Sequence, residues 1–121
     1  NTARRLAGAG TDNTNALGIG GETPGGASAL TESWNGSIWT ETSDLNTARQ
    51  ELGATGASNS SALAFGGSLN PPAVAFTEEW NAGINLGAWY TGGNLNTGRK
   101  ICRKRWNSNI CFSIWRRTTC C

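Results

Sequence analysis

The chain has 121 residues, a net charge of +2 and four cysteines, and it contains no histidine. That length is ordinarily enough for one domain, and the missing histidine excludes a histidine-ligated metal centre or a histidine general base built from this chain. No stretch is long and apolar enough to cross a membrane as a helix, so we predict no membrane span, and no residue pattern predicts a cofactor.

The charge is unevenly distributed along the chain. Through Arg99 there are four arginines and eight acidic residues, which give a net charge of −4. From Lys100 onward there are six cationic residues, no acidic residue and all four cysteines. So sharp a change in composition predicts a boundary near residue 100.

Three short landmarks recur along the sequence. An Asn-Thr-Ala/Gly-Arg segment begins at positions 1, 46 and 96, a glycine pair stands at 20–21 and 66–67, and a Thr-Glu-x-Trp-Asn segment stands at 31–35 and 77–81. The extra residues of the second copy fall before its glycine pair and between its two tryptophans, where turns are expected. Insertions confined to turns are typical of repeated structural units.

These landmarks divide the chain into repeat 1 (1–45), repeat 2 (46–95) and the start of a third repeat followed by a tail (96–121). A single repeat of this size cannot bury its own apolar face, so stable arrays contain several. We therefore interpret the chain as a fragment of a longer array.

In chain order, each repeat reads as four short strands. The pattern predicts strands over 6–11, 15–19, 29–34 and 38–41 in repeat 1, and over 52–57, 61–65, 74–80 and 88–91 in repeat 2. In the strand at 74–80, period two places Val74, Phe76, Glu78 and Trp80 on one face. Short strands separated by turn signals predict an all-β fold, and the abundance of Gly, Thr, Ser and Asn disfavours helix.

The order of these residues resembles the kelch repeat over residues 1 to 99. That family has a glycine pair closing a hydrophobic strand, then an aromatic residue, a turn, a tryptophan, and an arginine shortly before the next repeat. The matching positions here are Gly20, Gly21, Trp34, Trp39 and Arg49, and then Gly66, Gly67, Trp80, Trp89 and Arg99. Trp34 and Trp80 depart from the family by replacing its usual tyrosine.

The resemblance implies a β-propeller fragment with about two four-stranded antiparallel blades and the start of a third. The segments Leu-Asn-Thr-Ala-Arg and Ala-Leu-Ala-Phe-Gly-Gly are also similar to segments of kelch-like arrays in phage and environmental viruses. In such a fold we expect the tryptophans to pack between blades, with sugar stacking as the alternative. Arg4, Arg49 and Arg99 occur once per repeat, which favours a structural hydrogen-bonding role over catalysis.

The tail admits two interpretations. Taken literally, Arg99 to Trp106 is a basic patch with an aromatic residue, which could bind nucleic acid. The spacing of Cys102, Cys111, Cys120 and Cys121 matches no usual zinc pattern.

A slip of the reading frame by one base is the other interpretation, and the one we favour. Tryptophan has the single codon TGG, so the slip turns Trp106 and Trp115 into glycines, and position 115 lies 16 residues after Arg99, as Gly20 lies after Arg4. The codons from Trp106 to Arg116 can then be regrouped to contain Ser-Ala-Leu-Ala-Phe-Gly-Gly, the wording of residues 61–67. On this hypothesis the residues from about Lys100 onward are an out-of-frame third repeat, and no nucleic-acid partner is predicted.

The predicted function is a non-enzymatic binding or structural module, with a protein or glycan ligand, the further blades of the parent chain as partners, and a virion or cell surface as its place. Variable loops on a rigid frame would carry the binding. The candidate loop residues are Glu22, Thr23, Pro24, Ser68, Asn70, Pro71, Pro72 and Asn85. The alternatives are a fragment of a glycan-active or oxidase propeller whose catalytic residues lie elsewhere, and nucleic-acid binding through the tail.

Overall fold

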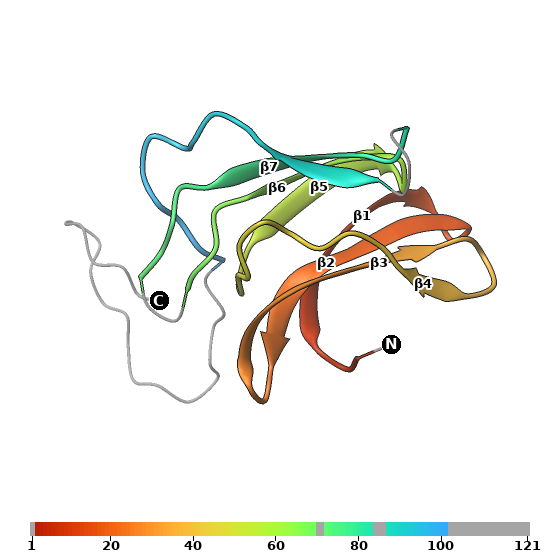
Figure 1. Ribbon diagram of the computed structural model, residues 1–121, viewed down its shortest axis with the longest axis horizontal. Coiled ribbons are helices and arrows are strands. Elements are labelled where there is room, and N and C mark those ends of the chain that lie inside the picture. The colour runs from red at the N-terminus through yellow and green to blue at the C-terminus, as the bar shows by residue number, and fades with distance from the viewer. Residues whose placement is uncertain (1, 70–71, 84–86, 102–121) are drawn as a thin grey trace, which may run out of the picture.

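The computed structural model describes residues 2–69, 72–83 and 87–101 (Figure 1). These residues form two four-stranded antiparallel sheets and no helix, which confirms the predicted all-β class. In this part of the chain there is accordingly no helix that could cross a membrane. The predicted third repeat beyond Ile101 lies outside the described residues, as do Asn70, Pro71 and Asn85.

Each sheet is a simple meander whose strands follow one another in chain order. The first sheet contains β1 (Arg5–Asp12), β2 (Asn15–Thr23), β3 (Gly26–Trp34) and β4 (Trp39–Glu41). The second contains β5 (Gly53–Ser58), β6 (Ser61–Phe65), β7 (Thr77–Asn81) and β8 (Ala88–Thr91). One sheet therefore falls within each repeat that the sequence predicted.

The strand registers of the two sheets correspond. Gly10 pairs with Ala16 in the first sheet, as Gly56 pairs with Ala62 in the second. Trp34 pairs with Trp39, and Trp80 pairs with Trp89. The four additional residues of the second repeat are thus absorbed in the β7–β8 connection without a change of register.

Three predicted strand boundaries are wrong. The strand expected at 74–80 begins only at Thr77, because Val74 N donates to Gly67 O and Phe76 O accepts from Gly66 N outside the ladder. Pro71-Pro72 in the preceding segment have no N–H to extend that ladder. In the first sheet, β2 and β3 run past the glycine pair as a hairpin that closes from Thr23 to Gly26, so Glu22 and Thr23 lie in a strand.

The first glycine of each pair makes room for the chain that enters the next repeat. Gly20 and Gly66 have φ values of 51° and 64°, in the region that favours glycine. A Cβ on Gly66 would lie 2.4 Å from the carbonyl oxygen of Arg99, and one on Gly20 would lie 3.2 Å from that of Arg49. The pair therefore permits a close approach of backbones that a side chain would block.

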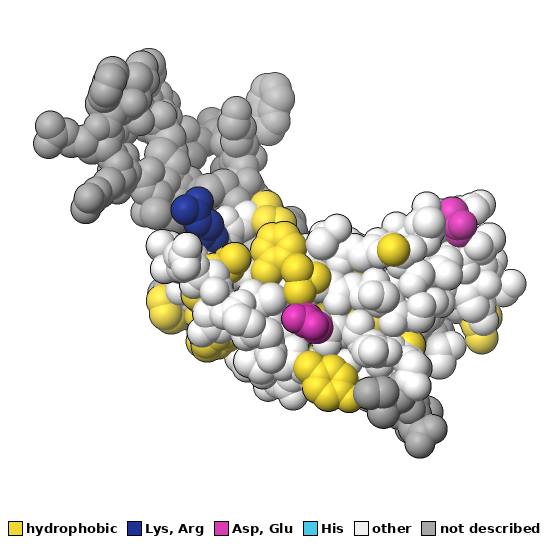
Figure 2. Space-filling model, turned by 90° about the horizontal axis from the view of Figure 1, so that it is seen from above, with side chains coloured by type: hydrophobic (Ala, Val, Ile, Leu, Met, Phe, Trp, Pro, Cys, Tyr) yellow, Lys and Arg dark blue, Asp and Glu magenta, His cyan; other side chains and the backbone are white. Residues whose placement is uncertain are grey.

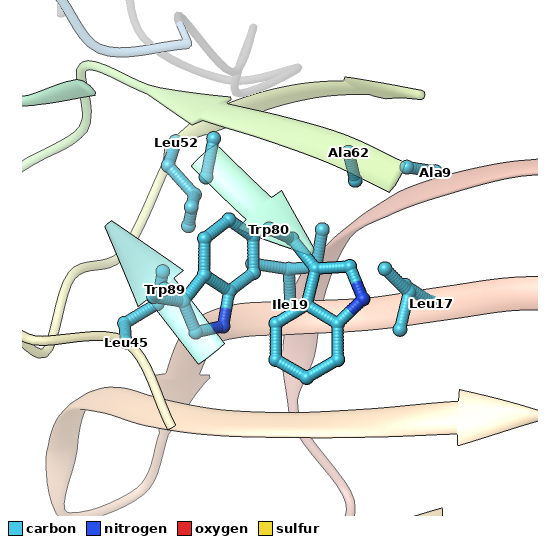
Figure 3. Close-up of a cluster of buried hydrophobic side chains, with 9 residues drawn as sticks. Ala9, Leu17, Ile19, Leu45, Leu52, Ala62, Trp80 and Trp89 are labelled. Atoms are coloured by element: carbon cyan, nitrogen blue, oxygen red, sulfur yellow. The ribbon is translucent and has the colours of Figure 1, made fainter. Parts of the chain in front are cut away.

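The hydrophobic core lies between the two sheets (Figure 3). Trp80 and Trp89 of the second sheet lie against Leu17 and Ile19 of β2, and β1 and β5 run side by side along one edge. Leu17 is 1% exposed and Ile19 is fully buried. Other members of this core are Ala9, Leu45, Leu52, Ala62 and Ala64. Burial of such side chains is the main favourable term in folding, and here only one interface supplies it.

Candidate functional site

Arg49 is the largest fully buried side chain among the described residues, and its guanidinium bonds only to the second repeat. Its Nη1 donates to the carbonyl oxygens of Gly66 (2.8 Å) and Phe76 (2.9 Å), and its Nη2 donates to Glu78 Oε1 at 2.8 Å. Burial lowers the pKa of Arg49 and the Glu78 carboxylate opposes that shift, so the guanidinium keeps its charge. We call this arrangement, one guanidinium held by two carbonyls and one glutamate, an arginine clamp.

The first sheet contains a second arginine clamp, around Arg4. Its three nitrogens donate to Gly20 O (2.9 Å), Leu30 O (3.1 Å) and Glu32 Oε2 (2.7 Å). The Arg4 side chain is fully buried and that of Glu32 is 8% exposed. Each acceptor stands 46 positions before its counterpart around Arg49. The same acceptor set is therefore built twice, although different guanidinium nitrogens serve it.

Asn46 completes the clamp of the second sheet. Its backbone N and its Nδ2 donate to Glu78 Oε2 at 2.8 and 2.9 Å, and Nδ2 also donates to Trp89 O at 3.1 Å. Both carboxylate oxygens of Glu78 are thus bonded to one Asn-Thr-Ala-Arg segment. A buried carboxylate is tolerated only when it is paired in this way, which explains why Asn and Arg recur three positions apart.

The backbone of Arg49 bonds to the first sheet while its side chain bonds to the second. Its carbonyl accepts from Gly21 N at 2.8 Å, and its own N donates to Ser28 O at 3.2 Å. Arg49 therefore joins both sheets. Its two backbone hydrogen bonds, to Gly21 and Ser28, fix the position at which the chain passes from the first repeat into the second.

Arg99 repeats the backbone half of this junction. Its carbonyl accepts from Gly67 N at 2.6 Å, and its N donates to Val74 O at 3.1 Å. Unlike Arg4 and Arg49, however, Arg99 is exposed. Arg4 and Arg49 each precede the sheet that binds their side chain. The residues after Arg99 that would form such a sheet are not among the described residues.

The four tryptophans of the two repeats form two equivalent pairs. The ring centroids of Trp34 and Trp39 are 5.4 Å apart, as are those of Trp80 and Trp89. Trp34 Nε1 donates to Asn13 O at 2.7 Å, and Trp80 Nε1 makes the corresponding bond at 2.9 Å. Only the second pair is buried between sheets, with Trp80 4% and Trp89 6% exposed, whereas Trp39 is 41% exposed. The difference arises because the described residues place no sheet over the first pair.

Trp89 also bonds directly across the junction. Its Nε1 donates to Thr31 Oγ1 at 3.1 Å. Asn46 and Thr31 contribute polar groups to the junction, and the sequence interpretation did not single them out. Their signal was present, since both belong to the recurring Asn-Thr-x-Arg and Thr-Glu-x-Trp segments.

The predicted binding loops do not form one surface. The β2–β3 turn and the connection from β6 to β7 lie at the same end of their sheets, which we call the loop end. The β7–β8 connection, which contains Asn85, starts and finishes at the opposite end. Asn85 itself lies outside the described residues.

Several candidates at the loop end have structural contacts of their own. Thr23 Oγ1 accepts from Gly25 N and donates to Gly26 O, which closes the β2–β3 turn. Ser68 is 2% exposed. The candidates that present surface at this end are Glu22, which pairs with Arg5 at 2.8 Å, and the exposed Pro24 and Pro72.

Within the described ranges, no cluster of three or more His, Cys, Asp or Glu side chains is arranged to hold a metal ion. Glu79, the neighbour of the clamped Glu78, is exposed. The sequence matches no protein-family model, and a search of curated proteins finds no match.

Proposed function

We propose that this chain is a section of a kelch-like β-propeller that serves as a non-enzymatic binding module, with its ligand held at the loop end. The observation that carries the proposal is the doubled arginine clamp. Both sheets contain the same set of hydrogen bonds around an arginine. The side chain of Arg49 is bound in the second sheet, while its backbone is hydrogen-bonded to the first. A clamp that continues from blade to blade suits a propeller, in which each blade contacts its neighbours.

The contrast between the frame and the loop end supports a recognition role. The clamps, the glycine pairs and the tryptophan pairs agree between the sheets, whereas the loop ends differ. The first sheet has the tight turn Pro24-Gly25, and the second has the longer connection from residue 66 to 76. A rigid frame with divergent loops is the arrangement that binding proteins use to vary specificity. Virion or cell-surface adhesion to a glycan or a protein is the function that we infer.

The test is binding of the full chain to an array of microbial and animal glycans, followed by titration of each glycan that binds. We expect Pro24→Ala and Pro72→Ala to weaken binding by tenfold or more. The matched control is Ser37→Ala, an exposed position at the opposite end of the first sheet. No binding to any glycan or immobilised surface protein, or equal losses at both ends, would contradict the proposal. Release of reducing sugar from a bound glycan would instead favour the enzyme alternative.

A further inference from the structure

The molecule has two outer sheet faces that correspond to the two faces of its internal junction. We call the face of β1–β4 that points away from β5–β8 the near face, and the face of β5–β8 that points away from β1–β4 the far face. Strand alternation assigns the residues to each face. The near face carries Leu6, Gly8, Ala16, Gly18, Trp34, Trp39 and Glu41, and the far face carries Thr55, Leu63, Phe65, Thr77, Glu79 and Tyr90.

The near face is apolar and hollowed. Leu6 is 43% and Trp39 is 41% exposed. A Cβ on Gly18 would lie 3.1 Å from Leu6 Cδ2 and 3.6 Å from Trp39 Cζ3, so these three residues share one surface. An open groove of about 600 Å³ reaches from this face across β1 to β5, because Leu6, Gly8, Ala16 and Trp39 line it together with Ala54, Thr55 and Gly56.

The apolar side chains Leu6, Trp34 and Trp39 of the near face have counterparts that are buried in the internal junction. Leu6 corresponds to Leu52, and Trp34 and Trp39 correspond to Trp80 and Trp89, each 46 or 50 positions later. Leu52 is 2% exposed beneath the first sheet. The internal junction therefore shows what covers a surface of this kind, namely a sheet that presents a leucine, a second apolar residue and a threonine.

The far face presents that set. Leu63, Phe65 and Thr77 stand 46 positions after Leu17, Ile19 and Thr31, which receive the tryptophan pair inside the molecule. Leu95 occupies the place in the second repeat that Leu45 has in the first. Leu95 N donates to Ala75 O, and Leu45 N donates to Ala29 O. Figure 2 looks down on this side of the molecule and shows hydrophobic side chains with an acidic side chain between them.

We propose that the near face of one molecule docks on the far face of a second copy of this chain, head to tail, by repeating the internal junction. Trp34 and Trp39 of one copy then cover Leu63 and Phe65 of the other. Trp39 Nε1 donates to Thr77 Oγ1 as Trp89 Nε1 donates to Thr31 Oγ1. Glu79 is an exposed carboxylate beside Leu63 on the far face, where the corresponding residue of the internal junction is Ser33. Covering this charge costs free energy, so we expect the docking of two copies to be weaker than the internal junction.

The copies have to resolve one overlap. Residues 1–4 of the copy that brings the near face and residues 96–99 of its partner correspond to a single segment of the internal junction, 46–49. Arg99 is fixed by two backbone hydrogen bonds, whereas Thr2 and Ala3 are exposed. We therefore expect Thr2 to Arg4 to move aside, with Arg99 of the other copy taking the place of Arg4, and this displacement makes the association weaker than the internal junction.

The two faces differ from each other, so the contact is heterologous and each added copy leaves one face of each kind open. The test uses sedimentation velocity of the full chain over a wide concentration range, with the variants Trp39→Glu and Leu63→Glu. We expect the unaltered chain to grow into dimers and larger species, and each variant alone to remain monomeric. An equal mixture of the two variants should form a one-to-one dimer that grows no further, because that mixture contains one intact near face and one intact far face.

Each other outcome overturns the proposal. A chain that stays monomeric at every concentration has no such contact. Dimers of Leu63→Glu alone would mean that two near faces meet, and dimers of Trp39→Glu alone would mean that two far faces meet. Circular dichroism of each variant checks folding, and if Leu63→Glu fails to fold, Thr77→Val replaces it and should weaken association of the full chain by several-fold. These outcomes do not depend on whether the loop end binds a glycan.

Discussion

Replacing Arg49 by methionine is expected to destabilise the chain by about 3–5 kcal/mol, which is a large share of the roughly 5–15 kcal/mol that a domain commonly has. The substitution leaves the Glu78 carboxylate buried without its cation and leaves the carbonyls of Gly66 and Phe76 without a donor. Both changes expose the full cost of burying a polar group that lacks a partner. Urea unfolding followed by tryptophan fluorescence measures the loss.

The matched control for Arg49 is Arg5→Met, which removes another arginine that pairs with a glutamate. The side chains of Arg5 and Glu22 are 64% and 38% exposed, so we expect a loss of less than about 1 kcal/mol. The double variant Arg49→Met/Glu78→Leu should lose less than Arg49→Met and Glu78→Leu do in sum, because it leaves no charge unpaired. Equal effects of Arg49→Met and Arg5→Met would contradict the clamp as a structural centre.

Replacing Trp89 by alanine is expected to cost about 3–5 kcal/mol, because it empties a large volume between the sheets. Trp89 is 6% exposed, packs in the core and donates to Thr31 across the junction. The buried Thr31 hydroxyl loses its donor in the same variant. Thermal unfolding monitored by circular dichroism, with urea unfolding for the free energy, measures the effect.

Trp39→Ala is the natural comparison for Trp89, since the two tryptophans occupy the same place in the two repeats. In dilute solution we expect Trp39→Ala to cost less than about half as much, because its ring is already 41% exposed. If both variants lost the same stability, the two sheets would not be stacked in the order described.

The repeat frame could be predicted from the sequence because its signals are local. The glycine pairs, the turn residues and the tryptophans recur in the same order, and five of the eight predicted strands agree with the observed ones to within one residue at each end. The strand at 74–80 was placed too early because the segment after Ser68 uses its backbone groups for Gly67 and Arg99 instead of the ladder. A preference for β structure does not reveal which partner a backbone group will bind.

The burial and the bonding partners of the side chains at the repeat positions could be assigned only from the structure. The sequence offers Glu78 and Glu79 side by side, and only strand alternation and the position of Arg49 decide that Glu78 is buried and Glu79 exposed. Similarly, Asn85 and Pro24 both read as loop residues, but the meander sends their connections to opposite ends of the sheets. Contacts between residues far apart in the chain leave no local pattern that could reveal them.

The claim that each repeat is a sheet locked to the next through its arginine can be tested by adding a repeat. In this experiment, residues 100–121 are replaced by a second copy of residues 50–95, so that Arg99 takes the place of Arg49 ahead of the new sheet. The account predicts one cooperative urea transition with a higher midpoint and a larger m-value than those of the original chain, and loss of the gain on Arg99→Met. An added repeat that unfolds separately, or a gain that survives Arg99→Met, would contradict it.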